Sequence, residues 1–206
     1  MRSFAFIIHP IDPKRDVARK YPLLGKVLSE EAIHFVCRFW PPVQLSHITG
    51  ARSQATGEEI EGWLIAVPYT PQRMLSLPQE VVYRKIVAAG KLAEKLGAQI
   101  LGLGAYTSVV GDGGITIAQR LDIPVTSGDS YTAAVAVQAT REAARLMDVD
   151  LTQVTLAVVG GAGATGAAVA QLLAPDVGRM LLIGRQTDPL TVVAGKVQHA
   201  GCKDVS

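Results

Sequence analysis

The sequence predicts an α/β protein whose second part contains a parallel sheet. Two apolar runs carry this prediction, Val154–Val159 and Met180–Ile183, because such short runs are typical of buried parallel strands. A helical segment, Ala167–Leu173, separates them, and glycines stand at 160, 161, 163 and 166 between the first run and that helix. A strand, a helix and a second strand in this order indicate a right-handed βαβ crossover.

Composition limits the classes of function. The 206 residues are 49% hydrophobic, which is enough for a substantial core, and the net charge is only +2. This charge balance lacks the dense basic stripe that nucleic acid binding requires, so we expect no nucleic acid partner. No apolar run reaches the roughly 18 residues of a membrane span. The two cysteines, Cys37 and Cys202, form no CxxC pair, and a reduced, cytoplasmic location is expected.

The first part of the chain reads as alternating strands and helices. Asp12 and Pro13 are typical of a helix start, as cap and first residue. The polar turn around Gly57 predicts a hairpin. Expected strands are Phe4–Ile8, Gln44–Ala51, Glu59–Ala66, Ile100–Leu103 and Pro124–Ser127, and expected helices are Glu30–Phe39, Gln79–Leu96 and Thr132–Met147. The segments 21–29 and 115–121 show no clear pattern.

The second part predicts a βαβα order. The strand Val154–Val159 is expected to be buried on both faces, and a further helix, Thr187–Gly201, follows Met180–Ile183. Lys203–Ser206 resembles the segment that leads into a third strand, and we expect that strand to lie beyond Ser206. We therefore expect an α/β domain over residues 1–150, followed by an incomplete Rossmann-type domain over residues 151–206.

The glycines fit a dinucleotide-binding loop in two registers. One is Gly161-x-Gly163-x-x-Gly166 and the other is Gly160-x-x-Gly163-x-x-Gly166. In either register the glycines allow a tight turn, close approach to a diphosphate, and close helix packing. The diphosphate would lie at the helix N-terminus, where free N–H groups favour anions. The expected cofactor-binding residues are Gly160, Gly161, Ala162, Gly163, Ala164, Thr165 and Gly166, with Thr165 adding a hydroxyl donor.

The position of Arg185 indicates which nicotinamide cofactor is bound. It follows the second strand, about 20 residues beyond the loop, where an NAD enzyme usually carries an acidic residue for the ribose. An arginine at this place can pair with the 2′-phosphate of NADP. We therefore expect NADP(H), while an exposed arginine at a strand end is the structural alternative.

Three further segments, 103–108, 126–133 and 150–153, match a known family together with the glycine loop. In these segments the sequence resembles long-chain acyl-[acyl-carrier-protein] reductases, which form fatty aldehydes, and related predicted amino-acid or shikimate-type dehydrogenases. The resemblance implies that residues 1–150 are an α/β substrate-binding domain. The resemblance implies an NADPH-dependent reduction of an acyl thioester by way of an acyl-cysteine. It also implies an acyl-thioester or small-molecule substrate, with an acyl carrier protein as a partner. A homo-oligomer is a further expectation.

The cysteines depart from that resemblance. The family's nucleophile lies downstream of the glycine loop, past Ser206, and neither Cys37 nor Cys202 occupies its place. Cys37 lies on an apolar helix face and is expected in the core. We therefore expect a C-terminally truncated chain with little or no reductase activity, and the catalytic residues stay unassigned.

Two polar segments are candidates for substrate contact. The first is Tyr106, Thr107 and Ser108, and the second is Asp129, Ser130 and Thr132. A structural alternative for the second segment is Ser130 as the N-cap of the following helix. His9, His34 and His47 show no metal spacing, so we expect no metal site. Lys85, Lys91 and Lys95 are expected on the solvated face of their helix.

Three functions follow from these observations. The leading one is an NADPH-dependent oxidoreductase that forms aldehydes from acyl carrier or acyl-CoA thioesters. The alternatives are a shikimate- or amino-acid-type NAD(P) dehydrogenase acting on a small molecule, and a non-catalytic nucleotide-binding module. Turnover of a long-chain thioester would indicate the reductase, and oxidation of a small hydroxy or amino acid would indicate the dehydrogenase. Cofactor binding without turnover of either would indicate the binding module.

Overall fold

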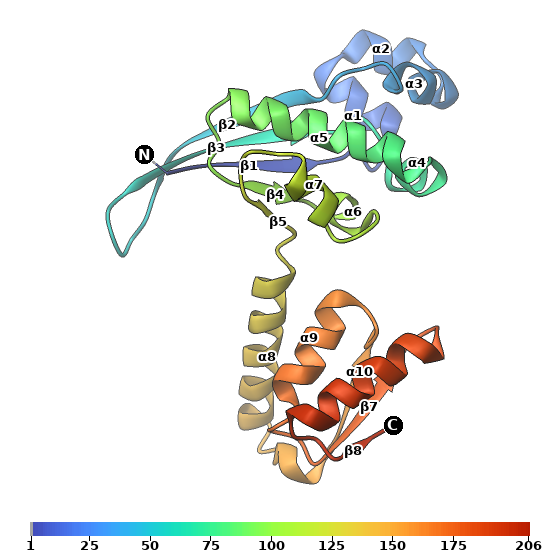
Figure 1. The fold of residues 1–206 in the computed structure, drawn as a ribbon. Helices are drawn as coiled ribbons and strands as arrows, with labels where there is room; N and C mark the ends of the chain where they lie inside the picture. The colour runs from blue at the N-terminus through green and yellow to red at the C-terminus, as the bar shows by residue number, and fades with distance from the viewer. Residues whose placement is uncertain (1) are drawn as a thin grey trace. The chain divides into compact units, whose positions relative to one another are not determined.

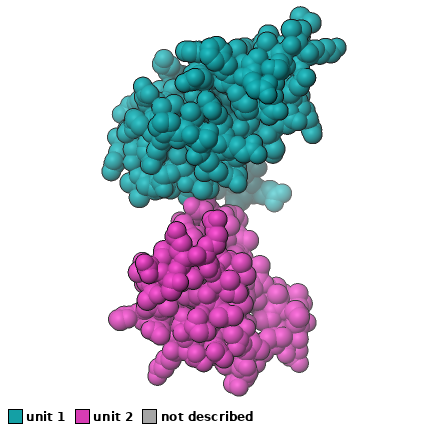
Figure 2. Space-filling model, turned by 90° about the vertical axis from the view of Figure 1, so that its right-hand side faces the viewer, with its two compact units in different colours: residues 1–127 teal, residues 128–206 magenta. Residues whose placement is uncertain are grey.

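The computed structural model describes residues 2–206, which form two compact units. The first runs to Ser127 and the second begins at Gly128 (Figure 2). This division lies before the boundary expected between residues 150 and 151. The intervening helix, α8 (Asp129–Leu146), packs against α9 (Ala164–Leu173) of the second unit. The assignment of a substrate domain and a cofactor domain stays a prediction.

The first unit contains a mixed five-stranded sheet in the order β2-β3-β1-β4-β5 (Figure 1). The parallel strand β1 lies between β3 and β4, and the antiparallel hairpin β2–β3 closes one edge, as the turn around Gly57 predicted. The strands are β1 (Arg2–Ile8), β2 (Val43–Arg52), β3 (Glu59–Ala66), β4 (Leu101–Leu103) and β5 (Val125–Thr126).

Seven helices are described in the first unit. The longest, α5, buries Val82 and Ile86 against Ala5, Ile7 and the rest of the core. The helices are α1 (Pro13–Lys20), α2 (Pro22–Val27), α3 (Glu30–Cys37), α4 (Pro71–Ser76), α5 (Gln79–Lys95), α6 (Tyr106–Val109) and α7 (Ile115–Gln119). Asp12 caps α1 by accepting from the backbone N–H of Arg15, and Pro13 is its first residue, as predicted.

The second unit is a parallel βαβαβ arrangement with strand order β6-β7-β8. Its remaining elements are the short 3-10 helix Leu151–Gln153, β6 (Thr155–Val159), β7 (Arg179–Ile183), α10 (Thr187–Ala200) and β8 (Asp204–Val205). Val158, Ala170, Met180 and Val197 form the centre of its core. The predicted α/β fold with a parallel sheet in the second part is confirmed.

Several details of the second unit differ from the sequence prediction. The third strand is present, because Asp204 and Val205 pair with Arg179 and Met180 of β7. The strand β6 is not buried on both faces: Val158 points into the core while Val159 is 79% exposed. The same alternation along β7 shows that helices cover only one face of this sheet within the described residues.

Two helix starts were also wrong. The N-cap of α8 is Gly128, in the left-handed conformation, and not Ser130, so α8 begins three residues earlier than expected. The segment from 21 to 29, which showed no pattern, contains the short helix α2 with Pro22 in its first turn. Among the described helices none is both long enough and apolar enough to cross a membrane.

Lys85 has a structural role that the sequence did not indicate. Its Nζ donates to the carbonyl oxygens of Arg38 and Trp40 at 3.1 and 2.8 Å, which fastens the end of α3 to α5. Burial lowers the pKa of Lys85. The expectation of a solvated lysine is therefore wrong for Lys85, while Lys91 pairs with Glu94 and Asp122 at the surface.

Replacing Lys85 tests this fastening. We expect Lys85→Met to lower the free energy of unfolding by about 1–3 kcal/mol, because two carbonyl groups lose their donor. Urea unfolding, followed by a spectroscopic signal that comes from the first unit, measures the change in the free energy of unfolding. The matched control is Lys95→Met on the exposed end of the same helix, and equal effects of the two substitutions would contradict the proposed role.

Candidate functional site

The glycine loop begins with a sharp turn at the carboxyl end of β6. Gly160 has a φ of +81°, a conformation that L-residues with side chains rarely adopt. Its N–H and that of Gly161 both donate to the carbonyl oxygen of Ile183, at 2.8 and 3.1 Å. The N–H of Gly163 then donates back to the oxygen of Gly160 at 2.9 Å, which closes the loop in front of α9. Gly160 is thus the residue that makes the tight turn.

The other glycines allow close packing in the loop. A Cβ on Gly166 would lie 2.3 Å from the oxygen of Gly160, a distance that no side chain can occupy without moving the backbone. A Cβ on Gly161 would lie 3.2 Å from the side chain of Leu182 on β7. The first turn of α9 therefore packs directly on the loop, as the motif requires.

The N-terminus of α9 has the features of an anion site. Its N-cap is Gly163, which offers no side-chain acceptor to the first amides of the helix. Unpartnered N–H groups and the positive end of the helix dipole together favour a bound anion. The residues present therefore fit the diphosphate of a dinucleotide, with the amides of Ala164, Thr165 and Gly166 as donors.

Asp129 forms a hydrogen bond with one of the side chains expected to bind the diphosphate. The Thr165 hydroxyl, expected as a donor to the diphosphate, donates instead to the Asp129 carboxylate at 3.1 Å. Asp129 belongs to the first turn of α8 within the same unit. The carboxylate orients Thr165, and its negative charge lies near the helix end where the diphosphate is expected.

Arg185 lies between the end of β7 and the start of α10. Its side chain is exposed, and no ion pair involves it in the part of the chain that the structure describes. Because β6 and β7 are parallel neighbours, their carboxyl ends share one edge of the sheet. Arg185 and the glycine loop thus lie at the same edge, where dinucleotides bind in parallel sheets.

The first group of predicted substrate residues forms the short helix α6. Thr107 is 1% exposed and its hydroxyl donates to the oxygen of Gly104 at 2.7 Å. The Ser108 hydroxyl donates to the oxygen of Ala105 at 2.7 Å. These two hydroxyls stabilise the turn, whereas Tyr106 is 40% exposed and is the member of the group best placed to meet a ligand.

The second group lies in the first turn of α8, in the other unit. The Thr132 hydroxyl donates to the oxygen of Gly128 at 3.0 Å, and Ser130 is exposed. Thr132 therefore closes the helix start. The three residues 106–108 are together in one unit, and Asp129, Ser130 and Thr132 are together in the other.

Sequence reasoning missed His9. Its ring meets that of Tyr106 edge to face at 5.9 Å, and its Nε2 accepts from the backbone N–H of Tyr106 at 3.3 Å. The Nδ1 atom lies 3.1 Å from the carbonyl oxygen of Pro10. An amide must donate and a carbonyl must accept, so this pattern fits the neutral ring with its proton on Nδ1.

The chain's topology brings His9 and Tyr106 together. They follow β1 and β4, which are parallel neighbours with Ile7 opposite Leu103. Ala105 between them has a positive φ of 47°, an unusual conformation for a residue with a Cβ. The signal in the sequence was a polar residue directly after β1 and another three residues after the end of β4, since parallel strands end at one edge.

The two cysteines lack the environment of an activated thiolate. Both are free and buried, Cys37 in the first unit and Cys202 in the second. Burial raises the pKa of each thiol, which keeps both protonated at neutral pH. Among the described residues no cluster of three or more histidine, cysteine or acidic side chains is arranged to hold a metal ion.

Two known proteins are similar to most of this chain. Over 164 residues the chain is 31% identical to a long-chain acyl-[acyl-carrier-protein] reductase of Synechococcus elongatus, a match that covers 74% of this chain and 48% of the reductase. The predicted resemblance is confirmed. Over 179 residues the chain is also 30% identical to Aminotransferase PigE of Serratia sp., covering 83% of this chain and 20% of that protein.

The chain thus spans about half the length of the reductase and a fifth of PigE. No family model matches it. A solved structure, the L-tryptophan dehydrogenase from Nostoc punctiforme, superimposes with a TM-score of 0.37 and 15% identity, and the alignment covers all of this chain and 51% of that one.

Adding a methyl group at Gly166 tests the packing of the loop. We expect Gly166→Ala to destabilise the second unit and to abolish dinucleotide binding, because the new Cβ must displace the Gly160 carbonyl. Thermal unfolding and a binding titration measure both effects. Gly195→Ala on α10, where a Cβ meets nothing within 4 Å, should instead stabilise by about 1 kcal/mol. Normal binding by Gly166→Ala would refute the loop assignment.

Proposed function

We propose that this protein binds NADP(H) at the Gly160–Gly166 loop and acts as an NADP(H)-dependent oxidoreductase on acyl thioesters. The observation that carries the proposal is the uncapped N-terminus of α9, packed by Gly166 against the turn at Gly160. The similarity to a long-chain acyl-[acyl-carrier-protein] reductase supports the substrate class. Two free thiols support a cytoplasmic location.

The residues at the edge of the sheet have distinct tasks in this proposal. The amides of Ala164, Thr165 and Gly166 hold the diphosphate, and the small side chain of Ala162 lets the backbone approach it. Arg185 pairs with the 2′-phosphate, which is absent from NAD(H). When bound, the nicotinamide supplies the hydride that reduces the acyl carbonyl carbon.

Arg185 is predicted to determine the preference for NADPH. We expect the chain to bind NADPH more tightly than NADH, and Arg185→Ala to weaken NADPH binding about tenfold or more, as loss of a charge-assisted hydrogen bond implies. NADH binding should change little. Calorimetric titration measures each affinity, and Lys196→Ala on α10 removes an exposed positive charge as the control. A chain that binds both cofactors equally would contradict the role of Arg185.

Asp129 is predicted to weaken cofactor binding in the wild-type chain. We expect Asp129→Asn to bind NADPH several-fold more tightly, because the amide keeps an acceptor for Thr165 and removes a negative charge near the diphosphate. The gain should shrink as salt is added, since screening reduces charge repulsion. Weaker binding by Asp129→Asn at low salt would show that the carboxylate assists the cofactor.

The substrate class requires a separate assay. Acyl carrier protein thioesters, acyl-CoA thioesters and small amino or hydroxy acids are each supplied with the preferred cofactor. The absorbance of the nicotinamide reports its oxidation or reduction. Aldehyde formation from a thioester supports the proposed reaction. Oxidation of an amino or hydroxy acid instead would assign a dehydrogenase, and cofactor binding without any turnover would assign a nucleotide-binding module.

A further inference from the structure

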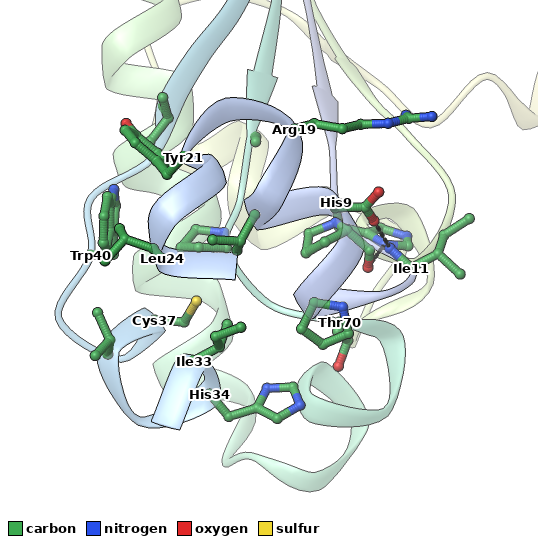
Figure 3. Close-up of a pocket in the computed structure, with 18 of the residues that line it drawn as sticks. His9, Ile11, Arg19, Tyr21, Leu24, Ile33, His34, Cys37, Trp40 and Thr70 are labelled. Carbon is green, nitrogen blue, oxygen red and sulfur yellow. Dashed lines mark hydrogen bonds between the residues drawn. The ribbon is translucent and has the colours of Figure 1, made fainter. Parts of the chain in front are cut away.

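A pocket of about 490 Å³ lies in the first unit between α3 and α4. Residues of α3 and the adjoining Arg38 line one side of it, and Thr70 with residues of α4 lines the other. Figure 3 shows His34 extending from α3 towards Thr70, where the pocket borders a larger cavity beside α1 to α3. The volume is within the range of sites that hold small ligands.

Arg73 of α4 has a hydrogen-bond donor with nothing to donate to. Its Nε is buried and has no partner in the described part of the chain, whereas most buried donors in proteins are paired. These residues provide no ion pair for Arg73 either. The Nε and one Nη lie on the same edge of the guanidinium plane, so one anion can accept from both. Because an unpaired buried donor is costly, such an anion would stabilise this arginine.

Thr70 and Arg38 add further donors to this pocket. Thr70 is 3% exposed, and its hydroxyl oxygen accepts from the N–H of Arg73 at 3.3 Å. No acceptor for the Thr70 hydroxyl proton is present among the described residues. Arg38 is exposed after the end of α3 and forms no ion pair in the same part of the chain. The pocket thus contains three groups, Arg38, Thr70 and Arg73, that can donate to one ligand.

Positive charge gathers around Tyr69, the residue that precedes the cap of α4. The Tyr69 ring is buried, and the Nζ of Lys85 lies 5.4 Å from its centre. Burial raises the pKa of the Tyr69 hydroxyl, and the charges of Arg73, Arg38 and Arg84 lower it. The three guanidinium groups are therefore close enough to act on one phenol. Because like charges repel, an anion among them would be attracted by all three.

The acidic side chains in this region leave the positive charge unbalanced. Glu30 pairs with His34 at 3.7 Å within α3, so this histidine is not counted among the free donors. Glu80 pairs with Arg120 at 2.7 Å. Glu31 also lines the pocket, and a hydrogen bond from its own backbone N–H lowers the pKa of its exposed carboxyl group. In the described lining, two arginines thus stand against this one carboxylate.

We propose that this pocket binds the phosphate group of a small organic phosphate, with the body of the ligand against Phe35. A phosphate monoester presents three terminal oxygens, which match the three donor groups Arg38, Thr70 and Arg73, whereas a carboxylate presents two. The ring of Phe35 is 60% exposed and lines the same pocket, so it offers an apolar surface to the rest of the ligand. This site goes beyond the proposed oxidoreductase activity, and it belongs to the first unit, whereas the glycine loop belongs to the second.

Three small anions test the chemistry of the site. Phenyl phosphate, inorganic phosphate and benzoate are titrated into the chain, and backbone amide chemical shifts are followed. We expect phenyl phosphate to shift the amides of residues 34–38 and 72–76 and to bind there several-fold more tightly than the other two, because it alone combines three oxygens with a ring. Benzoate or inorganic phosphate binding as tightly as phenyl phosphate, or unchanged amides at millimolar phenyl phosphate, would overturn the proposal.

Single replacements of arginine test the donors. We expect Arg73→Gln and Arg38→Gln each to weaken phenyl phosphate binding at this pocket about tenfold, as loss of a charge-assisted hydrogen bond implies. The matched control is Arg52→Gln, which removes an exposed arginine of β2 that does not line the pocket. Arg38 is exposed, so Arg38→Gln still decides the matter if Arg73→Gln fails to fold. Equal affinities of Arg38→Gln and Arg52→Gln would contradict the site.

Two further variants separate the ring from the phosphate and this pocket from the glycine loop. We expect Phe35→Ala to lower the affinity for phenyl phosphate to that for inorganic phosphate, whose own binding should not change. The amides of residues 162–166, followed in the same titrations, report phosphate binding at the glycine loop. Gly166→Ala should abolish changes at that loop and preserve those at residues 34–38, so the two sites succeed or fail separately. Loss of both responses in Gly166→Ala would assign phosphate binding to the second unit and overturn the proposal.

Discussion

The account of this protein depends on one close approach, that of the first turn of α9 to the carbonyl group of Gly160. Only a glycine at position 166 allows this distance, and only a residue free to adopt positive φ allows the turn before it. The result is a helix N-terminus aimed at the carboxyl edge of a parallel sheet with no side chain capping it. The anion site that we propose at this edge rests on backbone geometry and does not depend on any single charged side chain.

The same feature of parallel sheets organises the first unit. Strands β1 and β4 end side by side, so His9 and Tyr106 meet although 97 positions separate them in the sequence. The ring of His9 accepts a hydrogen bond from the N–H of Tyr106, directly after the unusual backbone at Ala105. Beside this edge, the helices α1 to α3 leave a cavity over the end of the sheet.

Local signals in the sequence predicted what backbone chemistry determines. The glycine spacing, Asp12 with Pro13, and the alternation of apolar runs with helices predicted the βαβ unit, the first helix cap and most strands. Side-chain partners were not predictable, because they depend on contacts distant in sequence. Lys85 was expected in solvent and binds two carbonyl groups of the α3 end, and the Thr165 hydroxyl is taken by Asp129. The exposed face of β6 was missed because an apolar run does not tell which faces are covered.

The most direct test of the central claim is an amide chemical-shift titration of the chain with NADPH. The account predicts that the largest changes occur at the backbone N–H groups from Ala162 to Gly166, with a separate change at Arg185 that NADH does not produce. Saturable binding that leaves these amides unchanged, or no binding at millimolar cofactor, would contradict it.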